Sequence, residues 1–193
     1  MTKHWERALP PGYRQTYVID AKSTKISIIL SLGALAITAA VFMVAVLMIK
    51  PKDFFAHYSM SKYMLTAAAI IAYIILHELT HGAAYKLLTK QKLKFGFTLT
   101  VAYCGVPDIY VYRTASLIAL LAPFVVFDIV FGVAVALLQD PWDKTYAAAL
   151  LALHLGGCIG DLYDTCLYLF KFRDPRTLMR DTGPMQTFYV PEI

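Results

Sequence analysis

The sequence predicts an all-α polytopic membrane protein, with four transmembrane helices and a short β-hairpin between the second helix and the third. Hydrophobic residues make up 59% of the 193 residues, and charged residues only 16%, against about 25% in typical soluble chains. The apolar residues gather in four runs that are each long enough to cross a bilayer. Between two of these runs, the hydrophobic period changes from that of a helix to that of a strand.

The four apolar runs define the expected spans, which cover residues 26–49, 63–88, 115–138 and 145–170. The first span carries no charge, and the segment before it lacks the apolar centre of a signal peptide, so we expect this span to be retained. The length of the chain favours a single domain over residues 1–193.

The segment at 93–112 predicts the hairpin. From Leu93 to Ala102, large apolar residues alternate with polar or small ones, which is the period of a strand. The run Gly105-Val106-Pro107-Asp108 is a turn signal, and residues 109–112 can return as the second strand. A final strand is expected at 187–190, within a polar tail.

Lysine and arginine are distributed unevenly between the two sides of the membrane. Four spans place the arm at 1–25, the hairpin and the tail on one side, together with fourteen of the eighteen basic residues; the other four are Lys50, Lys52, Lys62 and Lys144. Basic loops favour the cytoplasm. We therefore expect a multi-pass protein of the cell membrane with cytoplasmic termini and the lipid bilayer as a partner. The net charge of +5 then needs no nucleic-acid partner.

The cysteines indicate neither a disulfide framework nor a cysteine zinc site. There are three of them, without a Cys-x-x-Cys pair, and they fit small apolar positions: Cys104, Cys158 and Cys166.

The motif His77-Glu78-Leu79-Thr80-His81 lies in the second half of the second span. Histidines four apart share one face of a helix, so both imidazoles can reach one metal ion. The glutamate after the first histidine is placed to take a proton from a water that the metal activates. Ionisable residues inside an apolar span are costly and mark function. The motif therefore predicts a Zn²⁺ site with Glu78 as the base.

A third ligand is expected from the fourth span. Asp161 precedes Lys171 by ten residues, which places it about 15 Å below the cytoplasmic surface, at a depth similar to that of the two histidines. Asp164, one turn later, is the competing candidate. Small residues before Asp161 would allow this span to approach the second span closely: Gly156, Gly157 and Gly160. Two imidazoles and one carboxylate leave a fourth position open, as in catalytic zinc sites.

Two further ionisable residues lie deeper in the membrane, namely His154 in the fourth span and Asp128 in the third. Their depths are similar, so one interpretation pairs them with each other. The other interpretation places His154 in the cleft, where it would hydrogen-bond a substrate carbonyl or oxyanion.

These residues together resemble the zincin peptidases of domain-of-unknown-function family 3267, four-span bacterial membrane proteins related by motif to site-2-type intramembrane metalloproteases. The resemblance rests on the opening Leu9–Tyr13, the stretch His77–Gly82, the dipeptide Gly160-Asp161 and the tail around Asp181. It implies a zinc peptidase with His77 and His81 as ligands, Glu78 as base and Asp161 as third ligand. Site-2-type enzymes usually place an asparagine before this aspartate, where the present chain has His154.

The leading hypothesis is an intramembrane zinc metalloprotease that hydrolyses peptide bonds of a membrane-protein substrate. The hairpin could hold an unwound substrate by strand addition, or it could lie flat in the membrane interface. Two alternatives stay open: a non-proteolytic membrane scaffold or regulator with a structural metal site, and a zinc hydrolase of a lipid or a small amide. Glu78 separates the scaffold from both enzymes, because a structural site needs no base.

Overall fold

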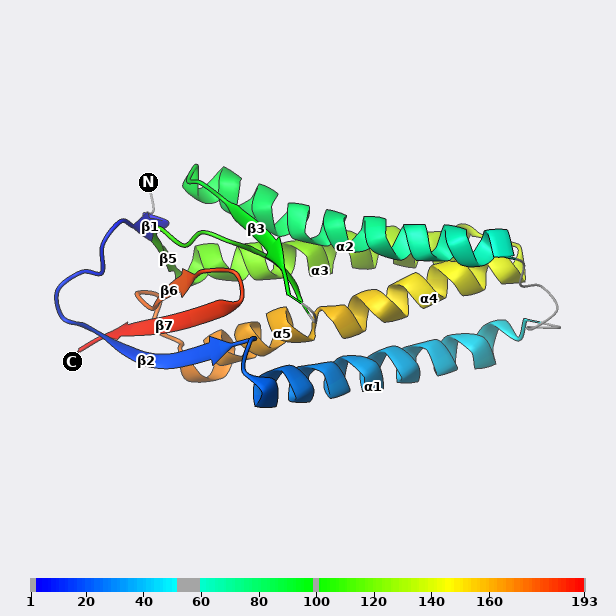
Figure 1. The fold of residues 1–193 in the computed structure, drawn as a ribbon, viewed down its shortest axis with the longest axis horizontal. Coiled ribbons are helices and arrows are strands. Elements are labelled where there is room, and N and C mark those ends of the chain that lie inside the picture. The colour runs from blue at the N-terminus through cyan, green and yellow to red at the C-terminus, as the bar shows by residue number, and fades with distance from the viewer. Residues whose placement is uncertain (1–2, 52–59, 99–100, 193) are drawn as a thin grey trace.

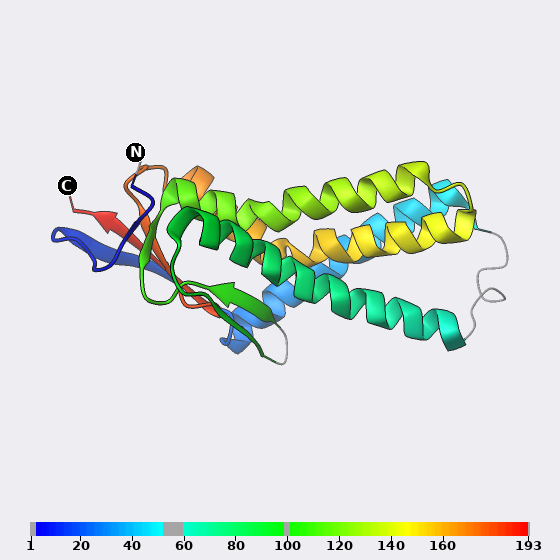
Figure 2. The ribbon, with the colours of Figure 1, turned by 90° about the horizontal axis from the view of Figure 1, so that it is seen from above.

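The helices run side by side, and at one end they meet a sheet, where both ends of the chain also lie (Figure 1). This computed structural model describes residues 3–51, 60–98 and 101–192. The helices are α1 (Thr24–Ile49), α2 (Met60–Thr89), α3 (Arg113–Leu137), α4 (Pro141–Gly157) and α5 (Ile159–Cys166), the last continuing as a π-helical turn, η1 (Leu167–Lys171). Seen from above, the sheet lies beyond one end of the bundle, and the hairpin lies beside the helices near that end (Figure 2).

Three helices, α1, α2 and α3, are long and apolar enough to cross a membrane, and α4 with α5 makes a fourth if the bent pair counts as one span. Of the four expected spans, three are confirmed as single long apolar helices, and the fourth corresponds to the bent pair. The fourth span is not one straight helix, however, because the chain bends by 42° between α4 and α5. The bend follows two successive glycines, Gly156 and Gly157, whose lack of a side chain makes a helix easy to interrupt.

The all-α prediction is wrong, because five short strands form an antiparallel sheet in the order β1-β5-β6-β7-β2. The strands are β1 (Trp5–Glu6), β2 (Tyr13–Asp20), β5 (Tyr110–Tyr112), β6 (Leu178–Asp181) and β7 (Met185–Pro191). Two expected strands fall on members of this sheet: the one at 109–112 falls on β5, and the one at 187–190 falls on β7. The expected arm thus contributes β2, whose partner is the C-terminal strand, with Tyr13 opposite Pro191.

The hairpin exists, but its pairing differs from the prediction. Strand β3 (Lys94–Phe97) pairs with β4 (Ala102–Gly105), so the expected strand over 93–102 is split in two. The chain turns earlier because the Thr98 hydroxyl accepts from the Val101 amide at 3.0 Å, a local bond that competes with an extended strand. The turn signal at 105–108 instead leads into β5, which belongs to the five-stranded sheet.

Two parts of the sequence-based predictions lie outside the described residues. Residues 99–100 belong to the expected strand alternation, and residues 52–59 form most of the expected connection between the first two spans.

The packed core lies where the helices meet the sheet. One cluster joins the sheet to α3 and to the end of the last span: Ile19, Leu120, Tyr168, Phe172, Met179 and Phe188. A second cluster joins α2, α3 and the loop before β5: Tyr85, Val106, Ile109, Val111, Ala115 and Ala119. These clusters hold the C-terminal end of α2 and the N-terminal end of α3 against the sheet, and the candidate site lies beside them.

The glycines of the fourth span do not act as expected. Gly156 brings α4 against α1, since a Cβ atom there would collide with the Thr38 side chain and the Ala34 carbonyl. Gly157 instead has the Tyr73 hydroxyl of α2 as its nearest neighbour, and Gly160 has open space. Close helix approach therefore joins the fourth span to the first, and the second span is reached through side chains.

Candidate metal centre

The two motif histidines and Asp161 converge from two helices. His77 and His81 are buried on α2, four residues apart on one face. Asp161 lies in the first turn of α5, directly after the bend. Its Oδ2 atom is 3.4 Å from His77 Nε2, and its Oδ1 atom is 3.4 Å from His81 Nε2. The bend in the fourth span thus directs this carboxylate at both imidazoles.

Each of the two nitrogen–oxygen distances, to a different oxygen of Asp161, equals the separation expected between two ligands of one zinc ion. Ligand atoms 2.0–2.2 Å from a tetrahedral zinc lie about 3.4 Å apart. His81 Nδ1 lies 2.8 Å from the Ala119 carbonyl oxygen, which can only accept, so this nitrogen carries the proton. A neutral His81 then presents the lone pair of Nε2 to a carboxylate. Lone pairs that face each other in a buried site are stabilised by a cation between them.

His77 is held by a chain of hydrogen bonds that leads away from Asp161. The Tyr73 hydroxyl lies 3.1 Å from His77 Nδ1 and 2.9 Å from His154 Nδ1. One proton arrangement satisfies every group: His77 Nδ1–H donates to Tyr73, and the Tyr73 hydroxyl donates to His154. His154 Nε2–H then donates to the Phe124 carbonyl at 3.3 Å. This arrangement leaves His77 Nε2 free for a metal.

His154 and Asp128 lie together, with His154 Nε2 3.5 Å from Asp128 Oδ1. This is the arrangement that pairing between the two residues predicts. His154 has no exposed surface, so it lies behind the Tyr73 hydroxyl and not at the cavity wall. The geometry therefore favours a supporting role for His154 over direct contact with a substrate.

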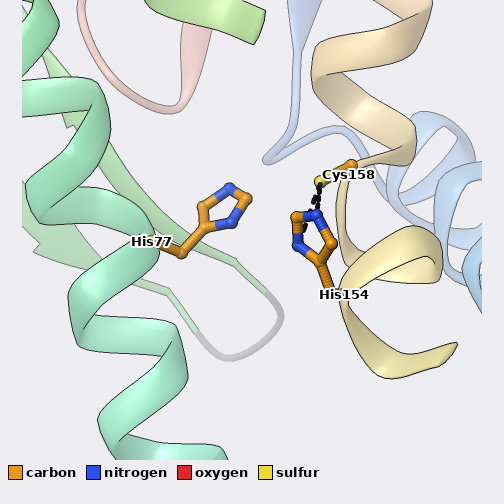
Figure 3. A group of neighbouring side chains, drawn as sticks. All are labelled: His77, His154 and Cys158. Atoms are coloured by element: carbon orange, nitrogen blue, oxygen red, sulfur yellow. Dashed lines mark hydrogen bonds between the residues drawn. The ribbon is translucent and has the colours of Figure 1, made fainter. Parts of the chain in front are cut away.

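A second group of ligand-type atoms surrounds His154, as Figure 3 shows: His77 reaches from α2 toward His154 and Cys158 at the end of α4. Their ligand atoms lie within 4.8 Å of one another. The Cys158 sulfur is 3.5 Å from His154 Nδ1. Both histidines already share the Tyr73 hydroxyl, which an ion here would have to displace. We therefore interpret this group as a support for His77.

Glu78 lines both a cavity and a neighbouring groove. The first, a cavity of about 140 Å³, also contains the two histidines and Asp161. The second is an apolar groove of about 500 Å³ between α2 and the hairpin. Residues 102–104 of β4 line the cavity together with Glu78. Since β3 pairs along one edge of β4, the opposite edge has no strand partner among the described residues.

A comparison with known families identifies the chain. Residues 70–175, more than half of its length, match the model of domain-of-unknown-function family 3267, whose description is "Putative zincin peptidase". The chain belongs to this zincin family. The resemblance inferred from the motifs is thereby confirmed. No curated protein and no solved structure matched the chain significantly.

The matched region contains every element of the zincin site described so far, from Tyr73 to Asp161, and it stops before β6. Strands β1, β2, β6 and β7 therefore lie outside it, although three residues of the C-terminal segment, Asp181, Gly183 and Gln186, line the cavity. In this zincin the C-terminal strands thus close the site from the side of the sheet.

Two further carboxylates line the cavity. Asp164 is buried, and within the described residues no ion pair joins it to either histidine. Asp181 accepts 2.8 Å hydrogen bonds from the Tyr85 hydroxyl and the Gly183 amide. Burial raises the pKa of Asp181 to about 6. Tyr85 lies one turn after His81, so this contact ties the C-terminal segment to the helix of the motif.

Sequence reasoning missed Tyr73 and the Ala119 carbonyl as contacts of the histidines. Tyr73 could have been suspected, since it precedes His77 by one helical turn within an otherwise aliphatic run. The carbonyl had no signal by residue type, because every residue has one.

Proposed function

We propose that the protein is an intramembrane zinc metalloprotease, in which His77, His81 and Asp161 hold the ion and Glu78 is the base. The observation that carries the proposal is the convergence of two Nε2 atoms and one carboxylate at 3.4 Å, beside Glu78, in a cavity between apolar helices. A scaffold with a structural ion would need the three ligands but no glutamate in the same cavity.

In the proposed reaction, the chain moves one proton and positions two groups. Zinc, when bound, polarises a carbonyl and acidifies water. Glu78 accepts the proton of the attacking water and returns it to the leaving amine. Glu78 lines the cavity beside Cys104 of β4. Tyr73 and the Ala119 carbonyl orient the two imidazoles.

The surroundings of Glu78 favour a peptide substrate that arrives from the lipid. The apolar groove is lined by side chains of α2 and the hairpin, including Ile71, Ile75 and Phe97, and it reaches Glu78. A segment in this groove would lie along the free edge of β4, where it could add as a strand. Strand addition also solves a chemical problem, since a transmembrane helix hides its carbonyls in its own hydrogen bonds until it unwinds.

The decisive experiment compares wild-type protein with Glu78→Gln. Each is purified in detergent, its zinc is counted by elemental analysis, and its hydrolysis of quenched fluorescent single-span peptides is followed. We expect about one zinc per chain in both proteins, and a loss of turnover of about 10²–10⁴-fold in the variant, as expected when a general base is removed. Glu192→Gln, the same change at an exposed position near the C-terminus, should keep full turnover.

Three results would contradict the proposal. Turnover above about one hundredth in Glu78→Gln would exclude the base role. Zinc-loaded wild type that cleaves no peptide would favour the scaffold, and cleavage of only a lipid ester or a small amide would favour the other hydrolase.

We also infer that the sheet and both termini face the cytoplasm. All three lie at one end of the bundle (Figure 1), and the excess of basic residues is on the same side. Reporter domains inserted at Val106 and at Trp142 should report cytoplasm and exterior, respectively. An external Val106 would reverse the side from which water reaches the cavity.

A further inference from the structure

The Ala119 carbonyl that orients His81 is unusual within its helix. Ala119 lies in the interior of α3 and has no exposed surface. An α-helical carbonyl normally accepts from the amide four residues later. For Ala119 that residue is Pro123, which has no N–H to donate. The oxygen is thus left without its helical partner, and His81 Nδ1 lies 2.8 Å from it.

A second carbonyl of α3 offers a comparison within the same helix. His154 Nε2 lies 3.3 Å from the Phe124 carbonyl oxygen, a longer contact than the 2.8 Å of His81. Four residues after Phe124 comes Asp128, which has an amide to donate. The shorter bond belongs to the carbonyl that the proline has released.

We propose that Pro123 is a positioning residue for the metal centre. By withholding one amide, it reserves the Ala119 carbonyl for His81, keeps the His81 proton on Nδ1 and directs the lone pair of Nε2 toward Asp161. The inference rests on the proposed zinc site for its consequence, but its physical core is a property of the ion-free protein. Proline in a helix interior is otherwise unfavourable, and Pro123 is buried against this site with less than 2% of its surface exposed.

The direct test is Pro123→Ala, which restores an amide to the Ala119 carbonyl and should not weaken the helix, since alanine is the best helix former. Zinc affinity is measured by competition with a chromophoric chelator. We expect affinity to fall about 10–100-fold, the usual effect of losing a partner of a ligating histidine. Pro141→Ala, a proline at the start of α4 far from the site, should leave the affinity unchanged.

A second readout needs neither zinc nor turnover. Nitrogen-15 NMR of the imidazoles in chelator-treated protein, at a pH where His81 is neutral, distinguishes the two neutral tautomers. Wild-type His81 should be found with its proton on Nδ1, and Pro123→Ala should populate both tautomers. Pro123→Gly also restores the amide and should behave like the alanine variant, which separates the effect of the amide from that of side-chain size.

The outcomes distinguish the two proposals. If the wild type binds no zinc but Pro123→Ala changes the His81 tautomer, the proposed zinc site is wrong and the role of Pro123 stands. Unchanged affinity and an unchanged tautomer in both folded variants would show that Pro123 only fills space. A fall in affinity in the alanine variant alone would also overturn the inference, since both variants regain the amide.

Discussion

The two ends of the helical bundle are built on different principles. At the end far from the sheet, the helices expose large apolar side chains such as Leu47, Met48 and Leu137. Within α1, all of which the structure describes, no residue is buried. At the sheet end, polar side chains are buried, and many of them pair with one another or with the backbone. Among the described residues, the buried histidines and aspartates are His77, His81, His154, Asp164 and Asp181, and all of them line or adjoin one cavity. The structure of the first end depends on its apolar composition alone, whereas the structure of the second end depends on individual residue pairs.

The largest expected effect is at the two aspartates of α5. Asp161→Ala should lose its zinc, because this carboxylate is 3.4 Å from both imidazoles. Asp164→Ala should keep zinc, since three residues of helix rise about 4.5 Å and turn about 300°, so the two carboxylates cannot take the same position. Zinc is counted after dialysis against a mild chelator.

The reverse pattern, an empty Asp164→Ala and a loaded Asp161→Ala, would invert the ligand assignment and leave the zincin family untouched. Loss of zinc from both variants would mean that the two carboxylates act as one unit, which the observed geometry does not support.

A smaller effect is expected where the sheet meets the bundle. Burial raises the pKa of Asp181 to about 6, from about 4 in an unfolded chain. The folded protein therefore holds this proton to a higher pH, and the stability contributed by the neutral acid is full below about pH 4 and lost as the pH rises through about 6. Asp181→Asn should remove about 2 kcal/mol of this pH dependence, measured by thermal unfolding of zinc-free protein at pH 4.5 and 7.5.

The matched control is Asp108→Asn, the same change at an exposed turn position. If Asp181→Asn keeps the pH dependence of the wild type, the carboxyl group is not desolvated in the folded protein. The cavity would then be open to water on the side of the C-terminal strands.

The sequence predicts one end of the molecule much better than the other. Apolar runs and the lipid-depth argument locate three spans within a few residues, and the depth of Asp161 brings it to the motif. The five-stranded sheet is not predictable in this way, because its strands are short and pair across most of the chain, as Tyr13 does with Pro191. No periodicity within such a strand identifies its partner.

The supports of the histidines show the same limit at the scale of single bonds. The spacing of His77 and His81 indicates that both reach one ion, but it does not predict the hydrogen-bond partners of their Nδ1 atoms. One partner, Tyr73, comes from the same helix, and the other is a backbone oxygen of α3. Only the folded arrangement of α2 against α3 reveals the second.

The smallest expected effect is at Tyr73, and it decides whether the hydrogen-bond chain supports the metal centre. Tyr73→Phe keeps the ring, which packs against Phe127 and Phe131 at centroid distances of 5.3 and 5.7 Å. It removes only the hydroxyl shared by His77 and His154. Zinc affinity should fall about tenfold, the lower end of the range for such partners, because His77 Nδ1 loses its hydrogen-bond acceptor.

The control for this change is Tyr63→Phe, the same substitution at an exposed position of the same helix, which should leave affinity unchanged. If Tyr73→Phe binds zinc as tightly as the wild type, the chain from His77 to His154 serves only to satisfy buried polar groups. The alternative, a group of His77, His154 and Cys158 that binds its own ion, makes the opposite prediction. Removing the hydroxyl would clear space between the two rings, and Tyr73→Phe would then bind a second zinc per chain.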